Sequence, residues 1–288
     1  MKLALAALSS LLLVLSFPRF SLSALMSVAL TPLLVAAARE QRHGRRFVLG
    51  WLTGAGCLAG VTDWIRFVVT FHGGLGEVGG WGVFFLYCLA KGLYFGVFGL
   101  LAGPLMSLWW AVPAISALWV AVDFTLGSLG YVWITAGHAG ADMGIPMRLA
   151  PYTGVHGLSF AFMIMATAMA QVALRSPRRR LLWLLALPLL ILLPPLPEFA
   201  PGQTRAAIVQ PNVEEERTWP QGQVEELHRM LALMSMQTVL KAGAKKPELI
   251  IWPEVPAPFY YDEDLSFRQN LGSLARATRT HVLFGTVV

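Results

Sequence analysis

The feature that most constrains this chain is a series of long apolar segments before residue 198. About 20 consecutive apolar residues cross the hydrocarbon core of a bilayer, and seven segments approach that length. With 56% hydrophobic and 13% charged residues, the chain is too apolar for an ordinary soluble domain. We therefore expect a membrane α-helical bundle of about seven spans, although the first segment also fits the apolar part of a signal peptide. The segments cover approximately residues 3–17, 20–38, 47–69, 81–103, 106–126, 154–174 and 181–197.

Basic residues indicate how this bundle is oriented. Two clusters, REQRHGRR at 39–46 and RSPRRR at 175–180, follow the second and sixth apolar segments. Cytoplasmic loops of membrane proteins are rich in arginine and lysine, so both clusters are expected in the cytoplasm. The seventh span then brings the remaining chain to the outer, periplasmic face. No aromatic residues are interleaved with either cluster, which argues against nucleic acid as a partner.

A change in acidic content marks a domain boundary near residues 194–203. The chain has 5 acidic residues before residue 198 and 11 from Glu198 onward. We expect residues 1–197 to form the transmembrane helical bundle and residues 198–288 to form a separate extracytoplasmic part. In that second part, β-type runs alternate with helical patterns, which predicts parallel strands joined by helices. The β-type runs cover 204–212, 248–252 and 281–288, and the helical patterns cover 221–243 and 265–279.

Glu254 lies at the position where such a sheet usually binds its ligand. It directly follows the apolar run LIIWP at 249–253, and ligand sites in parallel sheets lie beyond the carboxyl ends of the strands. Trp252 would shield one side of the carboxylate, and partial desolvation suits a general base. The alternative interpretation is a solvated glutamate in a turn.

Within the apolar segments, glycines and charged residues stand out. The runs GWLTG at 50–54 and GLYFG at 92–96 have the small-xxx-small spacing that lets helices approach closely in lipid. Charged groups are costly in hydrocarbon and therefore often functional, but Asp63 and Arg66 are also placed to pair with each other. Both interpretations stay open for the four ionisable residues Asp63, Arg66, Lys91 and Asp123. The cysteines, Cys57 and Cys88, offer neither a disulfide framework nor a Cys/His metal site.

Several blocks of the sequence resemble one family of membrane enzymes. The run LIIWPE at 249–254, preceded by AIVQPNV and ERTW, is similar to the start of a nitrilase-superfamily domain. Residues 54–76, 118–124 and 130–160 are similar to blocks of the apolipoprotein N-acyltransferases of bacterial inner membranes. Val132 stands where that family usually has proline, and Asp123 where it commonly has glutamate. The resemblance implies that residues 198–288 are the N-terminal portion of a nitrilase-like α-β-β-α sandwich.

The resemblance also implies a chemistry. The family moves an acyl chain from a membrane phospholipid to the N-terminal amine of a diacylglyceryl-cysteine lipoprotein, through a cysteine thioester, as the last step of lipoprotein maturation. It uses a Glu, a Lys and a Cys, and Glu254 matches the Glu as general base. The implied substrate-binding residues are Trp133, Trp219 and Trp252, with Trp219 at the lipid entry. The resemblance implies no cofactor and no metal.

The Lys and the Cys of the family have no counterpart in this sequence. No lysine follows Glu254, and both cysteines lie in the bundle. A three-stranded parallel sheet ending in HVLFGTVV would also leave a bare apolar edge. We therefore expect a sequence that is truncated at its C-terminus and inactive by itself. The alternatives are a membrane-tethered carbon–nitrogen hydrolase and a non-catalytic, degenerate membrane paralogue.

The expected topology can be tested at Gly222, which lies in the second part of the chain. A cysteine introduced there should react with a membrane-impermeant thiol reagent in intact spheroplasts, because the charge asymmetry places this part outside the cytoplasm. A cysteine at Gly44, within the first basic cluster, is the control and should react only after permeabilisation. Protection of position 222 in intact spheroplasts would contradict the topology.

Overall fold

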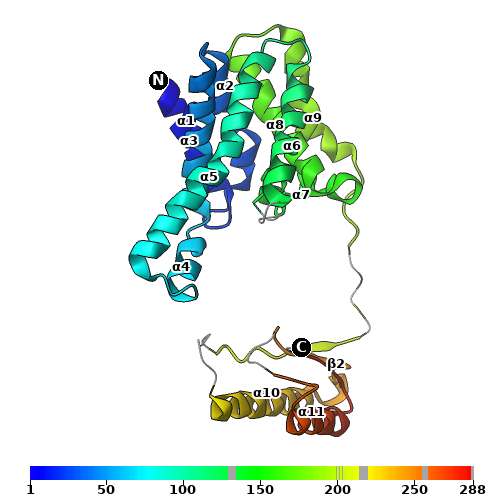
Figure 1. Cartoon of the computed structure of the whole chain (residues 1–288). Coiled ribbons are helices and arrows are strands. Elements are labelled where there is room, and N and C mark those ends of the chain that lie inside the picture. Colours follow the sequence, from blue (N-terminus) through cyan, green and yellow to red (C-terminus); the bar gives the residue numbers. More distant parts are fainter. Residues whose placement is uncertain are drawn as a thin grey trace. The chain divides into compact units, whose positions relative to one another are not determined.

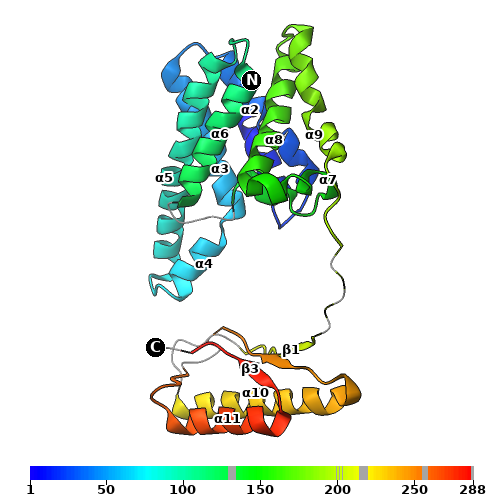
Figure 2. The same cartoon turned by 90° about the vertical axis from the view of Figure 1, so that its right-hand side faces the viewer.

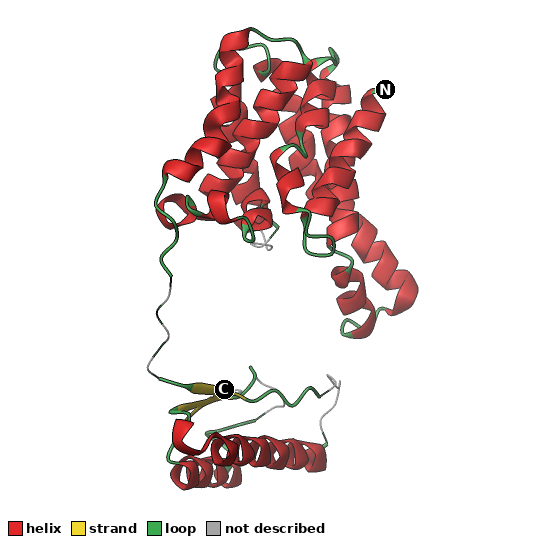
Figure 3. Ribbon diagram, turned by 180° about the vertical axis from the view of Figure 1, so that it is seen from behind, coloured by secondary structure: helices red, strands yellow, loops and turns green. Residues whose placement is uncertain are grey.

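The chain divides into two compact units, Met1–Pro197 and Glu198–Val288. The computed structural model of the chain describes residues 1–128, 134–198, 200, 202, 204–213, 220–254 and 259–286. Figure 1 shows the elements of each unit. In Figure 3 the first unit is helical, whereas the second combines helices with a small sheet.

Apolar helices build the first unit. A bilayer core contains no water to bond with free backbone groups, so a helix, which satisfies those groups internally, is the expected form of these sequences. The α-helices are α1 (Lys2–Ser16), α2 (Thr31–Ala38), α3 (His43–Val61), α4 (Trp64–Phe71), α5 (Gly76–Leu105), α6 (Ala111–Ser128), α7 (Gly144–Met147), α8 (Ala150–Ala173) and α9 (Ala186–Leu189). The 3-10 helices of this unit are η1 (Ser23–Ser27), η2 (Ala136–Gly140), η3 (Arg178–Leu185) and η4 (Leu190–Leu192).

Some of these helices are long enough to cross a membrane. Among the described residues, α5 and α8 have the required length and hydropathy, and α3 with α4 forms a third candidate that is bent by 63°. Proline, which removes a backbone donor, accompanies two of the shorter pieces, at Pro32 in α2 and Pro188 in α9. The structure thus supports a helical membrane part, while the count of seven spans stays a prediction. The remaining apolar helical segments have 10–17 residues and are Lys2–Ser16, Ser23–Ala38, Ala111–Thr125 and Arg180–Leu192.

Helices α3 and α5 pack closely because glycines line their contact. A Cβ atom added to Gly54 would lie 2.6 Å from the side chain of Phe95, and one added to Gly92 would lie 2.9 Å from the backbone nitrogen of Ala55. A Cβ atom on Gly50 would collide with the carbonyl oxygen of Phe95. The small-xxx-small spacing of the sequence predicts this close approach, and the contacts confirm it.

Paired charges close the bundle end that carries the first basic cluster. Lys2 Nζ donates a hydrogen bond to Glu40 Oε2 at 3.0 Å, and the backbone N–H of Arg42 donates to Glu40 Oε1 at 3.0 Å. The hydrogen bond from Arg42, followed by that from Lys2, lowers the pKa of Glu40 to about 2. Arg46 is buried, and its Nε donates to the backbone oxygen of Glu40 at 2.7 Å. These bonds fix the turn between α2 and α3.

The second unit contains a parallel sheet with the strand order β1-β2-β3. Both connecting helices lie on the same face of this sheet, as Figure 2 shows. The sequence pattern predicts the alternation of strands and helices and their parallel pairing, and the structure confirms both. Gly243, at a φ of 53°, ends the first connecting helix, and the turn η5 (Gly243–Lys245) follows. The elements are β1 (Ala206–Ile208), α10 (Gln221–Ala242), β2 (Leu249–Ile251), α11 (Leu265–Thr278) and β3 (His281–Leu283).

The two faces of the sheet differ in burial. Ala207 and Ile250 point toward the helices and join the core of this unit, which also contains Leu231 of α10. On the other face, Ile208 is 76% exposed and Leu283 is 56% exposed. Within the described residues, the sheet is therefore covered on one face, and its other face is apolar and open.

A glycine of the α3–α5 contact provides a test of the bundle packing. Gly50→Ala should lower the free energy of unfolding by about 1–3 kcal/mol, because the added methyl group forces the two helices apart. Gly44→Ala is the matched control on the same helix, where a Cβ atom meets nothing within 4 Å. The measurement is the thermal unfolding of both variants in detergent micelles. Equal melting temperatures for the two variants would contradict the contact.

Candidate functional site

The structure places Glu254 just beyond the carboxyl end of β2. Backbone pairing continues past the strands, because the N–H of Trp252 donates to the carbonyl oxygen of Leu283 at 2.9 Å and that of Val209 donates to the carbonyl oxygen of Ile251 at 2.9 Å. Pro253 follows at once, and its ring prevents further ladder bonding. Glu254 is exposed at the resulting bend. The carboxylate thus lies beyond the carboxyl ends of the strands, where parallel sheets bind ligands.

The side chain of Trp252 lies on the face of the sheet that α10 and α11 cover. It is 3% exposed, and its Nε1 donates a hydrogen bond to Ser235 Oγ of α10 at 2.9 Å. Ser235 Oγ in turn donates to the backbone oxygen of Leu231 at 2.7 Å. The indole therefore joins β2 to α10 and stiffens the strand from which Glu254 projects. A substrate contact of Trp252 stays a prediction.

The other two predicted substrate-binding residues, Trp133 and Trp219, lie outside the described residues. The residues that follow Trp133 are described, and their hydrogen bonds show how this part of the chain is held. The described chain resumes at Ile134 and enters η2, whose position is fixed by hydrogen bonds to α6 and α8.

Asp123 of α6 is central to these hydrogen bonds. It is 2% exposed, and its Oδ2 accepts hydrogen bonds from the backbone N–H of Ala136 at 3.2 Å and from Ser159 Oγ at 2.6 Å. Ser159 Oγ also accepts the backbone N–H of Gly137 at 2.8 Å. The described contacts of Asp123 are thus structural, since they hold η2 between two helices. Sequence reasoning missed Ser159, because 36 residues separate it from Asp123 and no local pattern links them.

Asp63 and Arg66 form the ion pair that the sequence suggested. Arg66 Nε lies 3.2 Å from Asp63 Oδ1 at the start of α4. Lys91 of α5 lies with its Nζ 5.8 Å from the centre of the Tyr94 ring. The Asp63–Arg66 contact supplies a structural account of these two charges.

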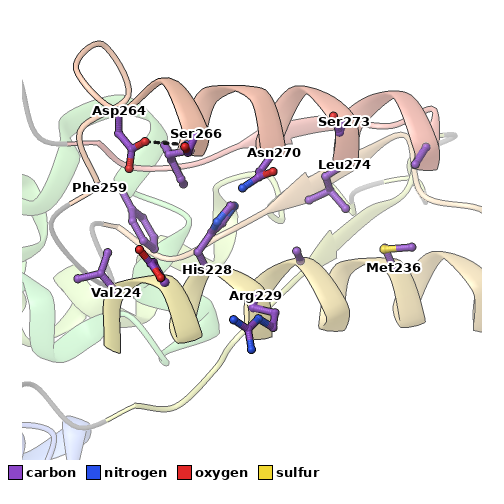
Figure 4. A pocket seen from close by; sticks show the side chains of 14 residues that line it. Val224, His228, Arg229, Met236, Phe259, Asp264, Ser266, Asn270, Ser273 and Leu274 are labelled. Atoms are coloured by element: carbon purple, nitrogen blue, oxygen red, sulfur yellow. Dashed lines mark hydrogen bonds between the residues drawn. The ribbon is translucent and has the colours of Figure 1, made fainter. Parts of the chain in front are cut away.

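A second polar feature lies between α10 and α11, where a cavity of about 690 Å³ opens to solvent. Figure 4 shows the His228 ring rising from α10 between the two helices toward Asn270 of α11. Its ring centre lies 4.9 Å from that of Phe267 and 6.1 Å from that of Phe259. Burial lowers the pKa of His228, and the nearby carboxylate of Asp264 opposes that shift.

His228 was not predicted from the sequence. Its aromatic neighbours, Trp252, Phe259 and Phe267, lie 24 or more residues later in the sequence, so no local pattern links them to it. Phe259, which lines the cavity, comes five residues after Glu254 in the sequence.

The described part of the chain offers few residues for a metal site or a reactive thiol. No group of three or more His, Cys, Asp or Glu side chains in that part is placed to hold a metal ion. Cys57 and Cys88 are both buried free thiols within the helical unit. Each thiol belongs to the packed interior of the bundle.

Comparison with known proteins identifies the family. Residues 9–168, more than half of the chain, match the family model described as the apolipoprotein N-acyltransferase N-terminal domain. The chain belongs to the apolipoprotein N-acyltransferase family. The matched region lies within the helical unit and includes α3, α5, α6 and η2.

Curated relatives with the name apolipoprotein N-acyltransferase extend this similarity into the second unit. The relative from Geobacter metallireducens is 29% identical, and the match covers 98% of this chain and 56% of the relative. That from Chlorobaculum tepidum is 29% identical, covering 88% and 49%, and that from Vibrio cholerae is 27% identical, covering 90% and 52%. The chain thus spans about half the length of these relatives.

The burial of His228 predicts a pH dependence of the second unit. Above the ordinary pKa of 6.5 the ring is neutral in both the folded and the unfolded chain. As the pH falls below that value, the unfolded chain binds a proton that the folded chain resists, so the unit loses stability until the lowered folded pKa is passed. His228→Gln should remove this part of the loss.

Hydrogen exchange measures the effect. The amides of α10 should become less protected between pH 7 and pH 5 in the native chain, after correction for intrinsic exchange rates, and less strongly so in His228→Gln. An identical loss of protection in both proteins would contradict a half-buried histidine that resists protonation.

Proposed function

We propose that this chain supplies the membrane bundle and the general base of an apolipoprotein N-acyltransferase. The observation that carries the proposal is the position of Glu254, exposed at the carboxyl edge of a parallel sheet, in a chain whose bundle belongs to this family. The acyl donor is a membrane phospholipid, and the acceptor is the N-terminal amine of a diacylglyceryl lipoprotein. Both substrates are lipid-anchored, which accounts for a sheet domain attached to a bundle.

The proposed topology has seven spans with the basic clusters in the cytoplasm. The helical segments at α1, at η1 with α2, at α3, α5, α6 and α8, and at η3 through η4 correspond to these spans. The arginines at 39–46 and 175–180 support a cytoplasmic position for the loops that contain them. Residues from 198 onward then lie on the periplasmic side of the bacterial inner membrane.

The second unit is proposed to be the first part of a nitrilase-like α-β-β-α sandwich. Its described part has one helix layer and one sheet, and the uncovered sheet face exposes Ile208 and Leu283. An open apolar sheet face is unfavourable in water and is normally packed against a second layer. The sandwich supplies such a layer.

The proposed reaction has two acyl-transfer steps. A cysteine thiolate attacks the ester carbonyl of the phospholipid, the C–S bond forms, and the ester C–O bond breaks to release a lysophospholipid. The amine of the acceptor then attacks the thioester, the C–N bond forms, and the C–S bond breaks. Glu254 takes the proton of the thiol and gives it to the departing oxygen of the lysophospholipid. It then takes the proton of the attacking amine and gives it to the departing cysteine sulfur. A lysine stabilises the oxyanion of each tetrahedral intermediate.

The 288 residues contain no lysine after Glu254 and no cysteine outside the bundle. Because the Lys and the Cys of the resembled family follow its Glu, we propose that the thiol and the lysine of this reaction are not among these 288 residues. In this scheme Trp219 lines the lipid entry, while Trp133 and Trp252 contribute to the substrate site. Exclusion of water from that site favours transfer to the amine over hydrolysis.

A chimera tests the proposed role of Glu254. Residues 1–286 are joined to the part of the Geobacter metallireducens relative that this chain does not match. The chimera should transfer labelled acyl chains from phospholipid to a diacylglyceryl peptide, whereas the 288-residue chain alone should not. Glu254→Gln should lower the rate about a hundredfold or more, since proton transfer contributes at least that much.

Glu263→Gln is the matched control, because this exposed carboxylate lies in the same segment between β2 and α11. It should leave the rate of the chimera close to that of the parent. Transfer by the 288-residue chain alone, or an undiminished rate in Glu254→Gln, would contradict the proposal. Hydrolysis of soluble amides without lipid transfer would favour a tethered carbon–nitrogen hydrolase.

A further inference from the structure

We propose that α4 lies along the membrane interface, between the hydrocarbon core and the headgroups, with its exposed aromatic face against phospholipid. The surface belongs to the α4–α5 hairpin, which we define as residues 63–81. The inference requires that the bundle crosses the bilayer, as proposed above, and is independent of acyl transfer. Figures 1 and 3 show α4 and the adjacent end of α5 extending beyond the neighbouring helices of the same unit.

Helix lengths place the hairpin near a membrane surface. An α-helix rises about 1.5 Å per residue, and the hydrocarbon core is about 30 Å thick. With 19 residues, α3 measures about 28 Å and nearly crosses the core before it ends. With 30 residues, α5 measures about 45 Å and exceeds the core by several turns. The 63° bend between α3 and α4 therefore falls where α3 leaves the hydrocarbon.

The two faces of α4 differ in what they contact. Ile65 is buried, and with Val69 it packs against a cluster formed by Leu58, Phe84 and Cys88. The other face is apolar and aromatic, and Trp81 of α5 extends it at 43% exposure. Tryptophan and other amphipathic aromatic residues favour the boundary between lipid tails and headgroups. The exposed side chains of α4 are Trp64, Phe67, Val68 and Phe71, each between 41% and 49% exposed.

The charges of the hairpin argue against both hydrocarbon and bulk water as its surroundings. Arg66 lies 3.2 Å from Asp63 Oδ1, 3.5 Å from Glu77 Oε2 and 4.8 Å from the centre of the Trp81 ring. The carboxylate side chains stay 43% and 64% exposed, which is costly in hydrocarbon. The aromatic face is unfavourable in water. The interface suits both the exposed carboxylates and the aromatic face, because one side of the hairpin then meets lipid and the other side meets water.

Nitroxide depth measurements on the full chain in lipid nanodiscs test this placement. Labels are attached to single cysteines at Phe67 and Phe71, one turn apart on the aromatic face, with Cys57 and Cys88 replaced by alanine. Leu89, an exposed residue well inside α5, is the hydrocarbon control. The readout is the ratio of collisions with oxygen, which enriches in lipid, to collisions with a water-soluble nickel chelate.

We expect the labels at 67 and 71 to lie at the same shallow depth, just below the phosphates, and the label at 89 to lie much deeper. A depth that differs by about 6 Å between 67 and 71, as one turn along the membrane normal requires, would make α4 part of a span. Strong nickel contact at both positions would place the face in water. Immobile labels that neither reagent reaches would mean that protein covers the face. Each of these three results would overturn the proposal.

Discussion

The hydrocarbon core of the bilayer is the constraint on which the first unit depends. Because no water is available there, backbone groups must bond within helices and the helices must gain contact by close packing. The glycines of α3 and α5 meet this requirement, since Gly50 and Gly54 bring the backbone of one helix against Phe95 of the other. A buried ionisable group needs partners of its own, and Asp123 finds them in Ser159 and the N–H of Ala136.

The second unit obeys a different rule, because water rather than lipid surrounds it in the proposed topology. There the apolar area buried by α10 and α11 against one sheet face provides the core. Trp252 lies in that core and bonds to α10, so the bend that follows it starts from a rigid strand. Glu254 gains a defined position from this arrangement without being buried itself. In the proposed reaction, this fixed position at the carboxyl end of the sheet lets Glu254 act as the base.

The sequence predicts the second unit well because its signals are local. The spacing of apolar residues predicts the strands β1 to β3 and the helix α10, and Gly243 predicts where α10 ends. The alternation of strands and helices predicts the parallel pairing. The spans are harder, because an apolar segment does not reveal where a helix breaks. The run at 47–69 bends at Thr62 and Asp63, and that at 181–197 forms short turns around prolines. At the site, Glu254 follows from its place after a strand, whereas the contacts of His228 and Ser159 arise only from long-range packing.

The central claim is that the edge carrying Glu254 works on lipid-anchored substrates. The most direct test is the distance of that edge from the bilayer, measured by relaxation of a nitroxide at position 254 by nickel-chelating lipids. A nitroxide at Lys245, which precedes β2 at the opposite edge of the sheet, is the reference. The account predicts strong relaxation at 254 and weak relaxation at 245. Stronger relaxation at 245 would contradict it, because Glu254 would then face away from the membrane that holds both substrates.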